Sequence, residues 1–389
     1  MTESIISSPT GIIAILAGVA AFFFYLENKT KWRLFNYFPP LLFIYTIPLI
    51  FSNTGIIPND SPVYGWMSTA ILPMFLIILM LDVEVLPAIR VMGKGVFVML
   101  LGTAGVVIGA PVGFFLVKSA LGPEAWKGFG TLAGSWIGGT GNMAAVSEGL
   151  GTSGADFGLA VLADNLVYII WLPIMLGSKN IAGWFHRFSR VDKNRIKMLE
   201  SSSDALNKDK GKLAMRHLLY LFFLGLFFAW LSGEIAQFIP QVPPVLTAGS
   251  WKILLITTFG IILSLTPAKK IPGSHQLAMA LVYLFVANMG ARANVSGLAE
   301  QAPWFLVGAY IWIFIHGSFC VLGARLFRVD IHSTAIASAA NIGGAASAPV
   351  VAAYHNEKLV PVSILMALLG YAIGNYGAFA AAWLCYLVS

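Results

Sequence analysis

Residues 134–142 read Gly134-Ser135-Trp136-Ile137-Gly138-Gly139-Thr140-Gly141-Asn142, a run of small and polar residues inside a long apolar stretch. A second run of this kind reads Ala340-Asn341-Ile342-Gly343-Gly344-Ala345-Ala346-Ser347. A helix that faces lipid gains little from such residues, and irregular backbone inside a membrane persists only where protein or water surrounds it. Both runs are therefore predicted to be re-entrant or broken helices inside a membrane protein.

The composition around these runs is that of a membrane protein. Charged residues make up 11% of the 389 and hydrophobic residues 58%, and the mean hydropathy is +0.80. A soluble domain of this length needs a larger charged surface. Apolar segments of about spanning length occur at 10–26, 35–51, 65–81, 95–118, 128–150, 157–177, 216–239, 251–266, 275–292, 303–325, 332–353 and 361–387. The first lacks a basic flank before it, so we expect a retained helix and not a cleaved signal.

The two halves of the chain align with each other. Ile137-Gly138-Gly139 falls on Ile342-Gly343-Gly344 at an offset of 205, and Gly102 falls on Gly308 at 206, as Asp82 does on Asn288. A nearly constant offset over several segments indicates an internal repeat. The sequence therefore predicts an N-terminal repeat at 1–177, a basic linker at 178–215 and a C-terminal repeat at 216–389.

Positive charge marks the cytoplasmic side of a membrane protein. Lys and Arg gather in the segments 27–34, 82–94, 178–215, 267–274 and 326–331. Twelve crossings would place 27–34 and 178–215 on opposite sides. If the two glycine-rich segments are re-entrant, ten crossings remain, the N-terminus lies outside, and all five segments lie inside.

Five crossings in each half make the second half inverted relative to the first, a design found in transporters. We therefore predict an all-α protein with two inverted repeats and about ten spanning helices. Two glycine-rich re-entrant or broken helices meet near the midplane of a bacterial inner membrane. A broken helix that crosses the membrane is the alternative, and it requires one span to be miscounted in one half.

The tips of the two glycine-rich segments are the predicted substrate site. Glycines let backbone approach a ligand closely, exposed N–H groups bind anions, and exposed carbonyls bind cations. The alternative is close helix packing through small residues. The candidate substrate-binding residues are Ser135, Gly138, Gly139, Thr140, Gly141, Asn142, Asn341, Gly343, Gly344 and Ser347.

One carboxylate lies deep inside an apolar helix. Asp164 occupies the middle of segment 157–177, where an unpaired charge costs several kcal/mol. We predict a Na⁺ or H⁺ coupling site at Asp164, with Asn165 and Asn375 as further candidates; a neutral, hydrogen-bonded structural Asp is the alternative. His316, inside 303–325, is expected to be a packing residue. Interfacial roles are expected for Asp82, Glu84, Arg292 and Asn294, at segment ends.

The sequence carries no enzymatic pattern. It has no Cys/His metal spacing, no phosphate-binding loop and no nucleophile elbow, so we expect neither an enzyme nor a cofactor, and no metal other than a coupling Na⁺. Cys320 and Cys385 lie in apolar segments and are expected in the core. The stretch from Lys179 to Arg216 has a net charge of +6 without interleaved aromatic residues. It is typical of a solvated cytoplasmic loop and not of a nucleic-acid site.

The runs Gly134–Asn142, Ser147–Gly151 and Asp164-Asn165 resemble an uncharacterised bacterial membrane family, the YjcL-like domain-of-unknown-function group 819, over nearly the whole chain. That resemblance implies a place in the clan of cation:proton antiporters and anion transporters. Citrate-type members of the clan carry Gly-Gly motifs at re-entrant tips, which correspond here to Gly138-Gly139 and Gly343-Gly344. Its sodium/proton antiporters carry an acidic pair, from which Asp164-Asn165 departs with one acid and a different order.

These observations favour a secondary active transporter of a small organic anion, carboxylate or amino-acid-like, in symport with Na⁺ or H⁺. A cation/proton antiporter, with Asp164 alternating between the two ions, is the alternative within transport. A membrane scaffold or sensor is the alternative of a different class. The expected partners are the small-molecule or ion substrate and the lipid bilayer, with homodimer formation left open.

Overall fold

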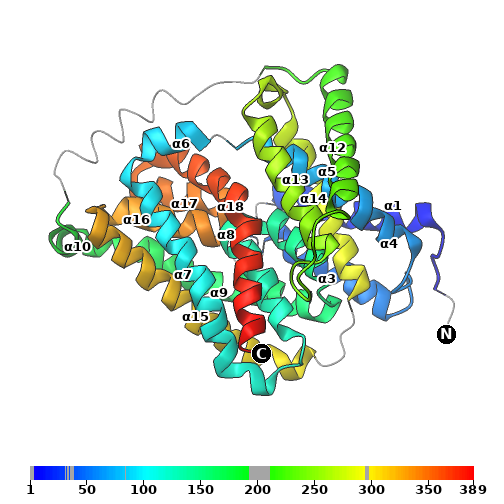
Figure 1. The fold of residues 1–389 in the computed structure, drawn as a ribbon, viewed down its shortest axis with the longest axis horizontal. Coiled ribbons are helices and arrows are strands. Elements are labelled where there is room, and N and C mark those ends of the chain that lie inside the picture. The colour runs from blue at the N-terminus through cyan, green and yellow to red at the C-terminus, as the bar shows by residue number, and fades with distance from the viewer. Residues whose placement is uncertain are drawn as a thin grey trace.

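The structure is a computed structural model, and it describes residues 4–389 apart from 31, 33–34, 36–38, 84, 192–210 and 294–297. Most of the described chain is helical (Figure 1). The helices of the first half are α1 (Pro9–Thr30), α3 (Pro40–Asn53), α4 (Pro62–Trp66), α5 (Leu72–Met80), α6 (Val85–Met92), α7 (Lys94–Val117), α8 (Ala125–Leu150), α9 (Gly154–Gly177) and α10 (Ala182–Ser189). Those of the second half are α12 (Met215–Ala236), α13 (Ala248–Ser264), α14 (Ser274–Arg292), α15 (Leu298–Phe327), α16 (Ile331–Ile342), α17 (Gly344–Asn356) and α18 (Val360–Leu387). A π-helix, η1 (Met67–Ile71), joins α4 to α5, and 3₁₀ turns occur at Lys118–Ala120, Ser178–Ile181, Pro267–Lys270 and Glu357–Leu359.

Within the described residues, seven helical stretches are long and apolar enough to cross a membrane. They are Pro9–Thr30, Pro62–Met80, Lys94–Ala120, Gly154–Ser189, Met215–Ala236, Ala299–Phe327 and Ser347–Leu387. Two shorter apolar helices, Pro40–Asn53 and Ala248–Ser264, accompany them. The all-helical, multi-pass membrane class is therefore confirmed, whereas the prediction of ten crossings stays a prediction.

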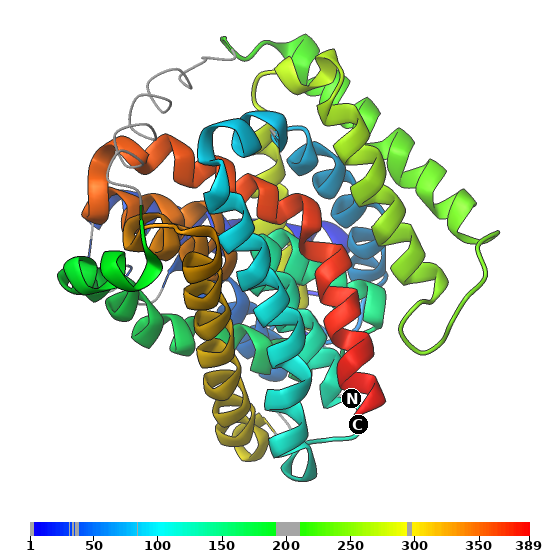
Figure 2. The ribbon, with the colours of Figure 1, turned by 60° about the vertical axis from the view of Figure 1, so that its left-hand side comes forward.

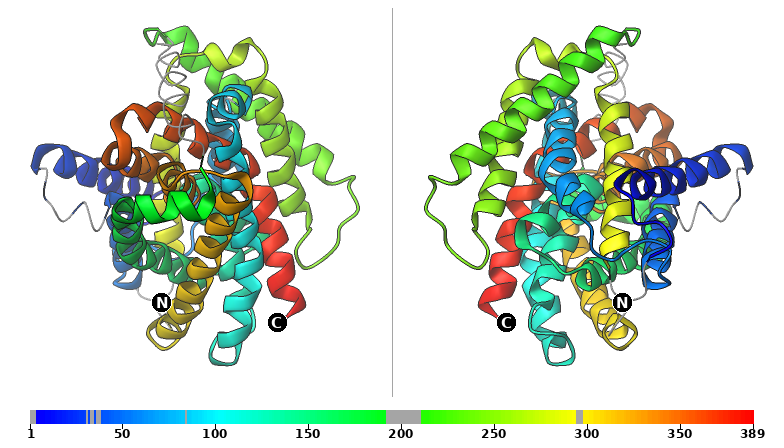
Figure 3. Two further views of the ribbon diagram at one scale, coloured as in Figure 1. Left: turned by 90° about the vertical axis from the view of Figure 1, so that its left-hand side faces the viewer. Right: turned by 90° about the vertical axis from the view of Figure 1, so that its right-hand side faces the viewer.

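The helices form two groups that lie side by side. We call α6–α10 with α15–α18 the hairpin bundle, and α1, α3–α5 and α12–α14 the side bundle; they occupy the left and right of Figure 1. Figure 3 shows α1 and α12 at opposite edges of the molecule. Of the predicted linker, residues 178–191 and 211–215 are described, and α10 lies in the first of these pieces.

Close approach between α7 and α15 organises the hairpin bundle. A methyl group added to Gly113 would lie 2.5 Å from the backbone oxygen of Gly308, and one at Gly105 would lie 2.7 Å from Cβ of Phe319. Small residues at helical spacing let two membrane helices pack backbone to backbone. Figure 2 shows α7, α15 and the last part of α18 running to the same end, where Lys118 Nζ donates a hydrogen bond of 2.5 Å to the backbone oxygen of Val388.

Glycines also let the helices of the side bundle pack closely on one another. Gly225 of α12 packs on Met74 of α5, and Gly260 of α13 packs on Met80. At one end of α5, Ser274 donates a 2.6 Å hydrogen bond to Asp82, which therefore joins α5 to α14. Asp82 is thus a buried structural residue at a segment end, and the interfacial role expected from the sequence stays a prediction.

Candidate functional site: two broken helices in contact

The first glycine-rich segment is a helical hairpin, which we call hairpin 1. Within α8 the backbone leaves the helical region at Gly139, with φ 73° and ψ −175°, a conformation that favours glycine. The arms on either side fold back on each other, because a methyl group added to Gly134 would lie 3.0 Å from Cα of Met143. Nearer the open end, the hydroxyls of Thr131 and Thr152 are 2.9 Å apart.

The second glycine-rich segment is also a hairpin, which we call hairpin 2. Its arms are α16 and α17, and the break lies at Gly343-Gly344, where Gly344 has φ 57°. Asp330 caps α16 by accepting a 2.8 Å hydrogen bond from the Ser333 N–H. The open end is closed by two histidines, since Nδ1 of His332 lies 2.9 Å from Nδ1 of His355.

The open ends of the two hairpins lie at opposite ends of α15. The ring of Phe129, in the first arm of hairpin 1, packs on Phe305 near the start of α15 with centroids 4.5 Å apart. Hairpin 2 instead follows directly after the end of α15 at Phe327. The hairpins therefore approach each other from opposite directions along α15.

The two breaks touch. A methyl group added to Gly344 would lie 3.7 Å from Cα of Gly139, and 3.9 Å from Cε1 of Tyr371 in α18. The same Tyr371 atom would lie 3.2 Å from a methyl group at Gly139. The expected proximity of the two glycine-rich segments is confirmed, and the Tyr371 ring lies beside both breaks.

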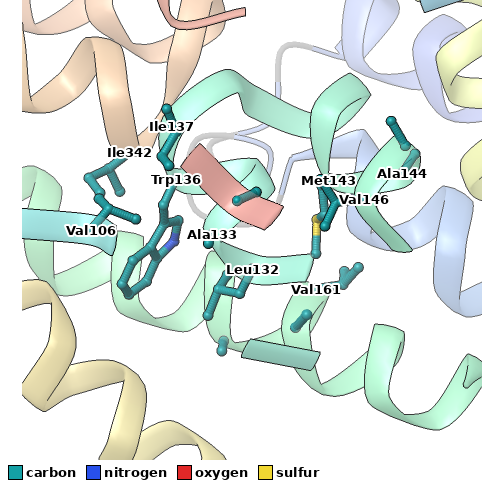
Figure 4. Packing of buried hydrophobic residues seen from close by; sticks show 14 of the residues in the cluster. Val106, Leu132, Ala133, Trp136, Ile137, Met143, Ala144, Val146, Val161 and Ile342 are labelled. Carbon is teal, nitrogen blue, oxygen red and sulfur yellow. The ribbon is translucent and has the colours of Figure 1, made fainter. Parts of the chain in front are cut away.

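Trp136 and Ile137 anchor the first arm of hairpin 1 in an apolar core. Figure 4 shows them beside Val106 of α7 and Ile342 of α16. The Trp136 ring packs on Trp312 of α15 with centroids 4.4 Å apart. This packing fixes the arm just before its break, so the backbone groups at the break are held in place.

Asp164 of α9 is bound to hairpin 1. Ser135 Oγ donates a hydrogen bond of 3.0 Å to one carboxylate oxygen of Asp164, and Trp136 Nε1 donates one of 3.0 Å to the other. One turn further along α9, the Tyr168 ring reaches hairpin 2, since its Cε2 would lie 3.1 Å from a methyl group added to Gly343. Asp164 and Tyr168 therefore link one face of α9 to both hairpins.

The two tip asparagines have different surroundings. Asn341 is fully buried, and its amide is used on both sides: Nδ2 donates to the Met99 oxygen (3.1 Å), and Oδ1 accepts from Thr103 (3.3 Å). Asn341 therefore fastens hairpin 2 to α7. Asn142 is also fully buried, and its Nδ2 donates to the Tyr371 oxygen (3.0 Å), while its Oδ1 has no partner.

The remaining candidates lie at different distances from the breaks. Thr140 is half-buried, and Gly141 packs toward Leu79 of the side bundle. Asn165 donates to the Val161 oxygen of its own helix (2.8 Å). Asn375 of α18 donates to Thr257 of α13 (2.7 Å).

The other residues singled out in the sequence analysis have structural roles where the structure describes them. His316 is fully buried, with Nδ1 2.9 Å from the Gly102 oxygen and Nε2 3.0 Å from Ser338 Oγ, as expected of a packing residue. Arg292 contacts Glu148 at 3.2 Å. Cys320 and Cys385 are buried free thiols, as predicted. Glu84 and Asn294 lie outside the described residues. In the part of the chain that the structure describes, no three His, Cys, Asp or Glu residues are placed to hold a metal.

Sequence reasoning did not find Tyr371, Tyr168, Thr103 or Thr257. Tyr168 carried a usable signal, since it lies four residues after Asp164 and so shares its helical face. Tyr371 and Thr103 contact the hairpins, and Thr257 contacts Asn375 of α18, each across a large separation in the chain that no local pattern records.

Together, the fold and the paired hairpins define a polytopic helical membrane protein built around two broken helices in contact. The chain belongs to the family described as a protein of unknown function (DUF819), whose model matches residues 14–387. It is 25% identical over 385 residues to the uncharacterized membrane protein YjcL of Bacillus subtilis (strain 168), covering 96% of this chain and 95% of that protein. The family resemblance is confirmed, and the place in a larger clan of transporters stays a prediction.

Proposed function

We propose that this protein is a secondary active transporter of a small organic anion, coupled to Na⁺ or H⁺, in a bacterial inner membrane. The contact between Gly139 and Gly344 carries the proposal. Broken helices that meet inside a membrane protein expose backbone N–H and C=O groups, which bind substrates and ions in secondary transporters. The opposite directions of the hairpins along α15 support an inverted-repeat arrangement with hairpins 1 and 2 as its re-entrant elements.

The backbone at the breaks suits an anion. The second arms begin at Thr140 and Gly344, and the first N–H groups of a helix have no partner within it. The positive end of each arm's dipole therefore points toward the contact, and this favours a carboxylate there. We assign substrate binding to this place and carry over the candidates at the tips, except that Asn341 acts as an anchor.

Asp164 is the proposed coupling residue. Its carboxylate accepts hydrogen bonds from Ser135 and Trp136, which precede the break of hairpin 1. A cation bound at Asp164 would alter these two hydrogen bonds. Binding of the coupling ion would thus act on the substrate site through the first arm of hairpin 1, which runs from Ser135 and Trp136 to the break at Gly139.

The test begins with purified protein and a library of carboxylates and amino acids. A ligand that binds the folded state raises the unfolding temperature by mass action. We expect stabilisation by one chemical class, stronger in NaCl than in choline chloride or stronger at one of two pH values. Compounds that stabilise are then offered to proteoliposomes under an imposed Na⁺ or pH gradient.

Asp164→Asn is the decisive variant, and Asp156→Asn, near the start of the same helix, is its control. Asp164→Asn should fold, because removal of an intramembrane charge relieves a desolvation cost. Its uptake per folded molecule should fall by more than about tenfold, since a charge-assisted interaction of about 1.5–3 kcal/mol is lost. Concentration of substrate by Asp164→Asn at the wild-type rate would refute the assignment.

Other outcomes separate the alternatives. Exchange of Na⁺ for H⁺ across the membrane without any organic substrate would identify a cation/proton antiporter. If no compound stabilises the protein and no gradient drives a flux, the chain is a scaffold or sensor.

A further inference from the structure

Two buried amide oxygens near hairpin 1 lack a hydrogen-bond partner. One is Oδ1 of Asn142, in the second arm of hairpin 1, and the other is Oδ1 of Asn375, in α18. Both residues have no solvent exposure. A buried polar atom without a partner costs about 1–3 kcal/mol, so two of them in one place require an explanation.

The two amides lie at the same contact between hairpin 1 and α18. Asn142 Nδ2 donates to the backbone oxygen of Tyr371, which is four residues before Asn375 and therefore on the same face of α18. Gly374 leaves room for the Asn142 side chain against α18, because a methyl group added to Gly374 would collide with Nδ2 of Asn142. Both amide groups therefore belong to one small region of that contact.

The donors and acceptors in this region are not balanced. The Nδ2 group of Asn142 donates to Tyr371, and that of Asn375 donates to Thr257 Oγ1 at 2.7 Å. Thr257 uses its own hydrogen to donate to the Ile253 oxygen at 2.9 Å. The two amide oxygens remain as acceptors, so a group that satisfies both must be a donor or a cation.

The backbone adds to this excess of oxygen. The first arm of hairpin 1 ends at the break, so its last carbonyls have no helical partner and carry the negative end of the dipole. The α-carbon of Gly138 lies 2.8 Å from a methyl group placed at Gly374, so the last turn of this arm borders the same region. Hard cations take oxygen ligands, and transporters bind Na⁺ with backbone carbonyls where a helix is unwound.

We propose that Asn142 Oδ1 and Asn375 Oδ1 are ligands of a Na⁺ site made of neutral oxygens, separate from Asp164. Asp164 contacts the first arm of hairpin 1 from α9, whereas Asn142 projects from the second arm onto α18. A neutral set of ligands binds Na⁺ without releasing a proton. The use of this site in coupling rests on the proposed transport function, whereas Na⁺ binding itself does not.

The experiment is a Na⁺ titration of the purified full chain, followed by its thermal unfolding, with choline chloride holding the ionic strength constant. Binding of ²²Na⁺ at equilibrium is the second readout. The wild type should show saturable stabilisation by Na⁺ that K⁺ does not reproduce. Asn375→Ala removes one ligand, and the Na⁺ concentration at half-saturation should rise by about tenfold or more.

Three further variants show that the effect belongs to this site. Asn53→Ala removes an asparagine of α3 whose amide donates to the Leu49 and Ala293 oxygens, and it should leave the Na⁺ midpoint unchanged. Asp164→Asn should retain Na⁺ binding at the neutral site. Asn375→Asp keeps the size and the Oδ1 ligand while replacing the Nδ2 donor by a charged oxygen, so Na⁺ should bind more tightly and in a pH-dependent way even if Asn375→Ala does not fold.

The proposal is overturned if Na⁺ stabilises the wild type no more than K⁺ does. It is overturned equally if Asn375→Asp binds Na⁺ as the wild type does, or if Asp164→Asn abolishes all Na⁺ binding. Na⁺ binding that depends on Asn375 in a protein without any flux would support this site and contradict the transport function, so the two failures are distinguishable.

Discussion

Gly139→Ala tests the break of hairpin 1. The φ of 73° and ψ of −175° at this residue lie in a region that glycine alone adopts readily, and another residue there costs about 1–3 kcal/mol. The added methyl group would also lie 3.2 Å from Cε1 of Tyr371, so the ring must shift. We expect the free energy of unfolding to fall by about 1–3 kcal/mol, a change of roughly 5- to 150-fold in the folding equilibrium.

Equilibrium unfolding in mixed detergent micelles measures this change. Gly65→Ala is the control for stability, because Gly65 is in a helix with no neighbour within 4 Å of an added methyl group. It should be neutral or stabilising by up to about 1 kcal/mol. Gly151→Ala is the control for the site, since Gly151 has φ 60° in open space at the open end of hairpin 1, away from its tip.

Gly151→Ala should reduce stability by about 1–2 kcal/mol without changing the affinity for Na⁺ or substrate. Gly139→Ala should reduce both the stability of the protein and its affinity for Na⁺ or substrate. If Gly139→Ala is as stable as the wild type, the backbone does not break at Gly139 and the contact with Gly344 loses its basis.

Two further predictions concern hairpin 2. Asn341→Ala removes hydrogen bonds to Met99 and Thr103 of α7 and should lower the free energy of unfolding by about 1–3 kcal/mol, whereas a variant that unfolds like the wild type would show that Asn341 is no anchor. The His332–His355 hydrogen bond exists only while at least one ring is neutral, so the unfolding temperature should fall between pH 7.5 and 5 as the second ring gains its proton. His332→Phe should lose this part of the pH dependence, and an unchanged pH profile would contradict the role of the pair.

The sequence was a good guide to the two breaks. Gly138-Gly139 and Gly343-Gly344 stood out because glycine in the middle of an apolar segment has few uses besides close packing and unusual backbone angles. The structure places non-helical or left-handed backbone at Gly139 and Gly344. Composition also predicted the membrane class, since the apolar segments are long enough to be recognised singly.

Other features depend on contacts between distant parts of the chain. Asn341 and Asn142 look alike in the sequence, yet Thr103 and Met99 of α7 saturate the first and leave it an anchor. Short helices such as α6 and α10 were missed because they lie in basic segments outside the apolar segments marked in the sequence. The Tyr371 ring joins both breaks, and a tyrosine in an apolar helix gives no local sign of such a place.

The packing of hairpin 1 on α18 has a consequence for biogenesis. Asn142 bonds to the backbone of Tyr371, and α18 begins about 200 residues after hairpin 1 ends. Because synthesis runs from the N-terminus, the ribosome makes the polar break long before it makes the helix that covers this break. Hairpin 1 must therefore wait in the translocon or against the earlier helices, and it reaches its final packing only after α18 has been made. A truncation that removes α18 should thus disturb the folding of hairpin 1, which is encoded about 200 residues earlier.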